Sequence, residues 1–159
     1  MRTMYLDDLS SLHRRLIAAF AVLFLGALLC SCTANDANPI DVHDAWSPAM
    51  PPGASVVAVY AEITAHQADT LLGVSTPVAQ TADMHTTLER GGMMHMEPLA
   101  ELPMTAGQTV RFEPGGRHLM LSGLRQILPV GTQFPLTLHF TVAGAVTIQV
   151  NVVAPGTRP

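Results

Sequence analysis

The sequence predicts an all-β domain of about eight short strands, arranged as a β-sandwich or a Greek-key barrel, behind an N-terminal targeting segment. Two observations support this fold class. Beyond residue 54, apolar and polar residues alternate with a period of two, and no window has the period of a helix. Turn signals also separate the alternating segments at intervals of about 8–12 residues, which is typical of sandwiches and barrels. The chain of 159 residues is long enough for one domain with a real core.

The N-terminus has the pattern of a signal peptide. Arg14 and Arg15 precede an apolar run, "LIAAFAVLFLGALL", over residues 16–29. This run is short for a bilayer span and fits the apolar region of a secretory signal. We therefore expect residues 1–31 to be a signal peptide and the rest of the chain to lie outside the cytoplasm.

The apolar run ends in "LLCSC", which resembles the cleavage motif of bacterial lipoproteins. Cys32 is the expected lipidated residue, since the bulky Leu29 directly precedes Cys30 and makes it a poorer candidate. A lipid on Cys32 would anchor the protein to a membrane. Ordinary cleavage near "CTA" and an uncleaved anchor remain as alternatives.

The composition excludes several classes of function. Charged residues make up 13% of the chain, there is no lysine, and the net charge of −4 lacks the basic footprint that nucleic acids require. After removal of the signal peptide, at most one cysteine remains. No disulfide, zinc–thiolate site or CxxC redox pair can then form within the chain. Seven histidines and nine methionines stand against these few cysteines.

The elements follow in order along the chain. Residues 32–54 hold the expected lipidated cysteine, a polar tether and a proline-rich loop, and residues 55–155 form the predicted β-domain. The expected strands are 55–63, 70–77, 80–90, 93–99, 108–114, 117–124, 133–141 and 145–153.

The predicted strand 117–124 has an unusual polar side. Leu119 and Leu121 take the core face, so His118 and Met120 point away from it. These two side chains lie roughly 7 Å apart along a strand and could converge on one ion. A surface histidine beside a stray methionine is the alternative interpretation.

The neighbouring hairpin provides a second pair of the same kind. A two-residue turn at 91–92 pairs Thr87 with Met96, and His85 lies on the same face as Thr87. His85 and Met96 are then diagonal neighbours about 7–8 Å apart, within reach of long side chains. Met94 shares this face, whereas Met93 and His95 lie on the other.

Two histidines and two methionines suit a soft metal ion. Thioether sulfur is uncharged and selects Cu(I), whereas zinc prefers thiolate, several histidines or carboxylate. Calcium and magnesium require oxygen ligands. A blue-copper electron-transfer site needs a cysteine ligand. A copper site without thiolate therefore indicates a protein that transports copper ions and not one that transfers electrons.

The four donors also resemble a known signature. The spacing of His85, Met96, His118 and Met120 resembles the H-x10-M-x21-H-x-M motif of the PCu(A)C family of periplasmic copper chaperones. The stretches "LLGVSTPVAQTADMH", "PGGRHLMLSGLRQILPVGTQFPLTLHF" and "AGAVTIQVNV" are similar to that family as well. The resemblance covers roughly residues 40–153.

This resemblance implies a cupredoxin-like Greek-key β-barrel with one exposed Cu(I) site. Independently, the sequence has no Ser/His/Asp spacing, no nucleophilic cysteine and no phosphate loop, so we expect no catalytic turnover. The implied ligands are His85, Met96, His118 and Met120. The resemblance further implies delivery of copper to the copper A centre of cytochrome c oxidase, often with a Sco-type thiol protein as partner. Copper storage or resistance, a copper-dependent oxidase and a metal-free β-sandwich binding module are the alternatives.

This sequence departs from the family pattern in the hairpin, where the run "MMHM" adds further potential metal donors. Met94 or His95 could compete with the four implied ligands. Some family members carry a His- and Met-rich C-terminal tail, whereas this sequence ends in "APGTRP", so we expect one site.

The remaining histidines and methionines are expected to serve packing or solvation. We expect Met84 in the core, Met50 and Met104 in packing roles, and Trp46 as a packing anchor. The expected solvated or structural side chains are His43, His66, His139, Glu89 and Glu97.

Overall fold

The computed structural model describes residues 38–158, and these residues contain no helix. The expected signal peptide and the lipidation site at Cys32 lie outside the described residues. Residues 38–158 belong to one compact unit. Within the described residues, no helix has the length and apolar character needed to cross a bilayer.

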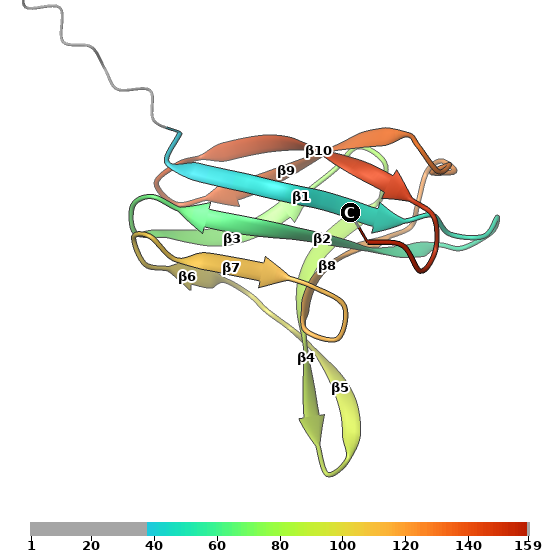
Figure 1. Cartoon of the computed structure of the whole chain (residues 1–159), viewed down its shortest axis with the longest axis horizontal. Helices are drawn as coiled ribbons and strands as arrows, with labels where there is room; N and C mark the ends of the chain where they lie inside the picture. Colours follow the sequence, from blue (N-terminus) through green and yellow to red (C-terminus); the bar gives the residue numbers. More distant parts are fainter. Residues whose placement is uncertain (1–37, 159) are drawn as a thin grey trace, which may run out of the picture. The chain divides into compact units, whose positions relative to one another are not determined.

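Ten strands build the domain (Figure 1). They are β1 (Ile40–Pro48), β2 (Val56–Ala65), β3 (Asp69–Ser75), β4 (Thr81–Arg90), β5 (Met93–Pro98), β6 (Leu102–Met104), β7 (Thr109–Phe112), β8 (Arg117–Ser122), β9 (Gln133–Phe140) and β10 (Ala145–Val153). The predicted all-β fold is confirmed, and each of the eight predicted strands has a counterpart.

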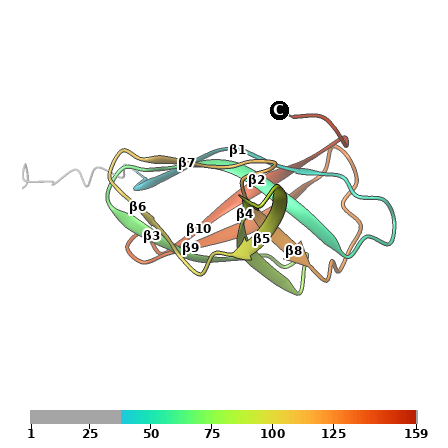
Figure 2. The ribbon, with the colours of Figure 1, turned by 90° about the horizontal axis from the view of Figure 1, so that it is seen from below.

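The strands follow the order β5-β4-β8-β2-β1-β10-β9-β3-β6, with β7 paired to β2. Only β1 and β10 run parallel; the other pairs are antiparallel. β2 pairs with two different strands along its length. Val56–Val59 pair with β8, and Ala61–Thr64 pair with β7. Figure 2 shows β1 and β7 in one layer and β3 and β9 in the other.

The core lies between these layers and follows the alternation of the strands. Along β9, the buried side chains are Phe134, Leu136, Leu138 and Phe140. His139, between the last two, is exposed. The period-two pattern therefore predicts the buried face correctly here.

The expectation of a tether and loop before residue 55 is wrong for residues 40–48, which form β1. The alternation fails there because the pairing with β2 shifts between His43 and Trp46. Asp44 adopts φ 50° in the shifted segment. The shift moves the buried positions from Ile40 to Ala45 and Ser47, so no single period-two pattern runs through the strand.

The second missed strand, β6, has only three residues and lies at the end of the strand order. Pro103 stands in its centre and is exposed. A proline is tolerated in a strand at a sheet edge, where its missing N–H leaves no ladder bond unmade. So short a segment carries no recognisable alternation.

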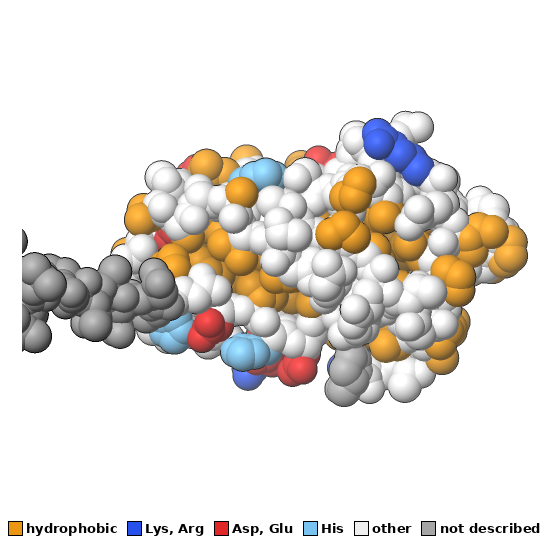
Figure 3. Space-filling model, turned by 90° about the horizontal axis from the view of Figure 1, so that it is seen from above, with side chains coloured by type: hydrophobic (Ala, Val, Ile, Leu, Met, Phe, Trp, Pro, Cys, Tyr) orange, Lys and Arg blue, Asp and Glu red, His pale blue; other side chains and the backbone are white. Residues whose placement is uncertain are grey.

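The β4–β5 hairpin projects from the body of the domain (Figure 1), toward the viewer in Figure 2. Its two strands pair continuously from His85 with Pro98 to Arg90 with Met93. The face of the molecule seen from above carries hydrophobic side chains among few acidic or basic ones (Figure 3). The hairpin forms a distinct end of the domain, in which β5 lies beside β4 and β4 lies beside β8.

Candidate metal centre

β8 presents His118 and Met120 on the face away from the core, as predicted. Leu119 and Leu121 on its other face are fully buried. His118 is nevertheless only 7% exposed. Its side chain lines a cavity together with Pro48 and Tyr60. The histidine is thus held in a recess and is not a solvated surface residue.

β4 brings His85 directly opposite His118 across an antiparallel pair. The two imidazole ring centroids lie 5.8 Å apart with an angle of 16° between the ring planes. Met120 faces Asp83, two positions along β4 from His85. Met120 is therefore a diagonal neighbour of His85 on the same face of the sheet.

The hairpin places Met96 beside this pair. Gly91 and Gly92 have φ values of 61° and 77°, the left-handed region that a tight two-residue hairpin turn requires. The resulting register pairs Thr87 with Met96, which makes Met96 the diagonal neighbour of His85 on the other side. The predicted register of the hairpin is confirmed.

Three adjacent strands therefore bring the four predicted donors to one face. His85 is central on β4, with Met96 on β5 and His118 and Met120 on β8. This arrangement depends on parity, since a slip of one residue in either pair of strands would move a donor to the opposite face.

Each histidine has a ring nitrogen free for a metal. Nδ1 of His118 lies 3.1 Å from the carbonyl oxygen of Gly116. A carbonyl only accepts, so Nδ1 is the donor, and in a neutral ring the lone pair then lies on Nε2, the arrangement common in metal-bound histidines. Nδ1 of His85 is buried and has no hydrogen-bond partner in the structure. Burying such a nitrogen is unfavourable unless something pairs with it.

A cavity of about 400 Å³ joins three of the donors, namely Met96, His118 and Met120. Among the described residues that line it, none is acidic or basic apart from the histidine. Burial raises the pKa of Tyr60, another lining residue, above its ordinary 10.0, and the positive charge of Arg158 opposes this. The phenol therefore stays neutral and adds no charge.

His85 opens on a second cavity of about 380 Å³, which also contains Asp83 and Met120. Met120 lines both cavities and so lies between the two histidine environments. An ion bound by all four donors would be positioned near the sulfur of Met120.

The donor set fits a monovalent soft ion. Two imidazoles and two thioethers are neutral, so the bound ion keeps its whole charge. The cost of transferring an ion from water rises with the square of its charge, which favours Cu(I) over a divalent ion. Across residues 38–158, no three His, Cys, Asp or Glu side chains gather closely enough to hold a metal.

The additional donors of the hairpin lie at different places. Met94 is opposite Glu89, on the face of Met96 but nearer the turn, and is 61% exposed. His95 is opposite Leu88, on the other face of the hairpin. The register therefore separates His95, but not Met94, from the four donors.

The other expectations can be compared with the structure directly. Met84 and Met104 are both 3% exposed and belong to the core, as predicted. His139 is exposed and lies 2.7 Å from the hydroxyl of Ser75. Trp46 packs on Tyr60, with ring centroids 4.7 Å apart.

The remaining exposed groups also follow expectation. His66 is exposed and lies 2.6 Å from a carboxylate oxygen of Asp41, and His43 is exposed. Glu89 is exposed, whereas Glu97 forms an ion pair of 2.8 Å with Arg90.

The expected packing role describes only part of the environment of Met50. Met50 is 39% exposed and lines the same cavity as Met96, His118 and Met120. Its position in the loop between β1 and β2 gives no periodic signal, and only the fold brings that loop to the donors.

The fold and the side chains together define an all-β domain with a cluster of two histidines and two methionines on one sheet face. Residues 40–152 match the family described as "Putative lipoprotein LpqE-like", and the chain belongs to this LpqE-like family. A relative from Leifsonia xyli subsp. xyli, named "Putative lipoprotein Lxx21020", is 28% identical over 110 residues. That match covers 67% of this chain and 65% of the relative, so the chain spans just under two thirds of it.

Solved structures show the same fold. The copper-bound PCuAC domain from PmoF2 is 26% identical with a TM-score of 0.62, covering 74% of this chain and 94% of that domain. Apo-DR1885 from Deinococcus radiodurans is 30% identical with a TM-score of 0.59, covering 78% and 85%. The Cu(I) form of DR1885 is 27% identical with a TM-score of 0.54, covering 82% and 87%. The resemblance to PCu(A)C domains and the cupredoxin-like fold are confirmed.

Proposed function

We propose that this protein binds one Cu(I) ion through His85, Met96, His118 and Met120 and passes it to an acceptor outside the cytoplasm. The observation that carries the proposal is the gathering of these four neutral donors on one face of three adjacent strands. The similarity to a copper-bound PCuAC domain and to Cu(I)-bound DR1885 supports the choice of metal.

Transfer by ligand exchange follows from the donors. Thioethers hold Cu(I) without neutralising its charge, so the thiolates of an acceptor bind the ion more strongly. Met96 is 53% exposed, whereas His118 is buried. An acceptor can therefore approach from the hairpin side and replace Met96 before the histidines release the ion. No catalytic turnover is needed for this role.

The proposed acceptor is the copper A subunit of cytochrome c oxidase, with a Sco-type thiol protein as a possible intermediate carrier. This step is supported by the resemblance to the PCu(A)C family alone. A strain lacking the protein should assemble less copper A, which can be measured from the absorption of the oxidase. Copper sensitivity with normal copper A content would instead indicate storage or resistance.

We also propose that Cys32 carries a lipid that anchors the protein to a membrane surface. The LpqE-like family and the Leifsonia relative are both described as lipoproteins, which supports this localisation. Labelling cells with a radioactive or clickable fatty acid tests it. The native chain should incorporate label, and Cys32→Ser should not.

The binding function is tested by titrating the purified chain with Cu(I) under reducing conditions against a chromogenic Cu(I) chelator. The native protein should retain one equivalent. Met96→Leu/Met120→Leu keeps the apolar volume but removes both sulfur atoms. We expect its affinity to fall by about a hundredfold or more, corresponding to roughly 2.7 kcal/mol.

Met93→Leu is the matched control. It removes one sulfur atom from the opposite face of the same hairpin. Its affinity should equal that of the native chain. Equal affinity of the native protein and the double variant would contradict the assigned ligands, and failure of the native protein to compete would favour a metal-free binding module.

A further inference from the structure

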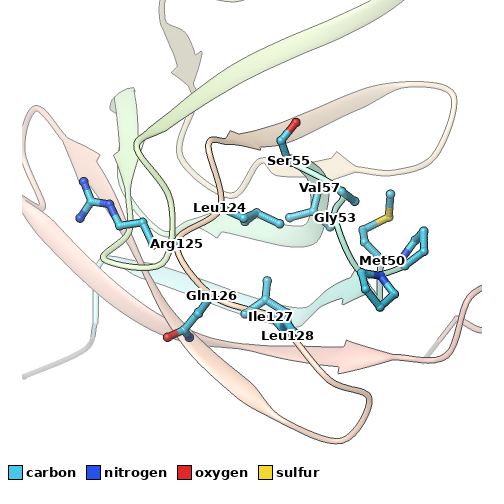
Figure 4. Close-up of a pocket in the computed structure, with 12 residues that line it drawn as sticks. Met50, Gly53, Ser55, Val57, Leu124, Arg125, Gln126, Ile127 and Leu128 are labelled. Atoms are coloured by element: carbon cyan, nitrogen blue, oxygen red, sulfur yellow. The ribbon is translucent and has the colours of Figure 1, made fainter.

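Met50 is a partly exposed methionine in the loop between β1 and β2. Its side chain is 39% exposed and borders two cavities. One is the cavity of about 400 Å³ that contains Met96, His118 and Met120. The other measures about 350 Å³ and extends to Arg125, with Met50 at its opposite end (Figure 4).

The backbone around Met50 is fixed although the side chain is not enclosed. The amide of Ala49 donates to the carbonyl of Val153 over 2.8 Å, and the amide of Ala54 donates to Pro51 over 3.1 Å. Two prolines, Pro51 and Pro52, follow Met50 directly and restrict the chain further. The loop therefore presents a flexible thioether from a rigid position beside the donors.

Met96 and Met120 are held very differently at the other side of this cavity. Met120 stands on β8, which is paired on both sides by β2 and β4. Met96 stands on β5, the last strand in the order, and is 53% exposed. Of the two thioethers, Met96 is the one that can leave the ion with least disturbance of the sheet.

We propose that Met50 is a further thioether donor of the copper site, which binds Cu(I) in place of Met96 while the ion enters or leaves. This inference rests on the proposed function and extends its ligand set. When Met96 withdraws, the ion stays bound to His85, His118 and Met120 and is open to the shared cavity. Met50 is the remaining sulfur donor that borders this cavity.

The exchange is a substitution of one neutral ligand by another. The bond from Cu(I) to the sulfur of Met96 breaks and a bond to the sulfur of Met50 forms, with no change of charge, proton or oxidation state. With Met50 in place of Met96, the site therefore keeps four protein donors, whereas without Met50 only three would remain.

A double-mutant cycle tests the proposal on the purified full chain in detergent. Met50→Leu, Met96→Leu and the double variant keep apolar volume at both positions. The dissociation constant for Cu(I) is measured with a competing chelator under reducing conditions. Because each donor substitutes for the other, the double variant should lose about tenfold more affinity than the product of the two single losses.

Met93→Leu combined with Met96→Leu is the control cycle, and its effects should multiply without coupling. Extraction of Cu(I) by excess chelator gives an independent readout, in which Met50→Leu should release the ion several times more slowly than the native chain. Thermal unfolding of the apo variants verifies that the fold is kept.

The role of Met50 would be overturned if the affinity losses of Met50→Leu and Met96→Leu simply multiplied and Met50→Leu released Cu(I) as fast as the native chain. Tight Cu(I) binding by the native chain would in that case leave the proposed function intact. Absence of Cu(I) binding by the native chain would overturn both. X-ray absorption of copper-loaded Met96→Leu should still show two sulfur neighbours, and a single sulfur neighbour would also refute the substitution.

Discussion

At the scale of single residues, the two histidines of the proposed site differ in how their rings are held. Nδ1 of His85 is buried without a hydrogen-bond partner, while His118 opposite has its Nδ1 bonded to Gly116. An unpaired buried nitrogen destabilises the metal-free fold by about 1–3 kcal/mol. Binding of an ion at this ring would remove part of that cost.

We therefore expect His85→Leu to stabilise the metal-free protein by about 1 kcal/mol while abolishing tight Cu(I) binding. Thermal unfolding and Cu(I) competition measure the two effects. His139→Leu is the control, because that ring is exposed and bonded to Ser75. A His85→Leu variant less stable than the native chain would show that the ring has a structural partner.

Asp69 is a second residue with an unusual environment. Burial by itself raises the pKa of Asp69, but the backbone amides of Val142, Ala143 and Thr70 outweigh it and hold the pKa below the ordinary 3.8. These amides donate over 2.9, 2.8 and 2.7 Å. The carboxylate thereby ties the start of β3 to the turn between β9 and β10.

Because the pKa of Asp69 is lower in the folded than in the unfolded protein, its carboxylate stabilises the fold fully at pH values above the unfolded pKa. This stabilisation is lost as the pH falls through the folded pKa. We expect Asp69→Asn to cost about 1–3 kcal/mol at pH 7 and less at acid pH. Urea unfolding at pH 7 and near pH 3 measures the difference between the two chains. A difference that does not shrink in acid would contradict this assignment.

At the scale of elements, the hairpin turn decides where Met96 lies. A Cβ at Gly91 or Gly92 would meet no atom within 4 Å, so only the positive φ opposes a side chain there. Left-handed backbone costs about 1–2 kcal/mol for an ordinary residue, whereas asparagine tolerates it.

Gly91→Ala/Gly92→Ala should therefore loosen the hairpin and weaken Cu(I) binding, while Gly91→Asn should leave both unchanged. Amide hydrogen exchange along β5 and Cu(I) competition provide the measurements. Rapid exchange in β5 with native copper affinity would indicate that Met96 is not a ligand.

The elements also show where sequence reasoning succeeds and fails. β8, β4 and β5 alternate regularly, so parity and one glycine turn were sufficient to predict two pairs, His85 with Met96 and His118 with Met120. That the two pairs form one set was implied by the family resemblance, because the pairing of β4 with β8 is not readable from the sequence. β1 was missed because its register shift changes the parity of the buried side chains. Met50 was missed because its relation to the site depends on contacts between a loop and strands distant in sequence.

At the scale of the whole molecule, β1 is central to the sheet although its sequence resembles a linker. It lies between β2 and β10, and Ile40 and Ser47 are fully buried. The domain therefore begins near residue 38, in agreement with the match to the LpqE-like family from residue 40.

We expect a chain of residues 38–159 to unfold cooperatively and a chain of residues 55–159 to lack a stable fold, because removing β1 exposes edges of β2 and β10. Circular dichroism during heating compares the two. Equal transitions would show that β1 adds little to the core.

The central proposal for the whole molecule is that a single Cu(I) ion is bound by His85, Met96, His118 and Met120. Diffraction from crystals of the copper-loaded protein, recorded on both sides of the copper absorption edge, tests it most directly. We predict one anomalous peak within bonding distance of all four side chains, next to the sulfur of Met120. A peak at the outer face of the hairpin beside His95, or no peak in a loaded crystal, would contradict the claim.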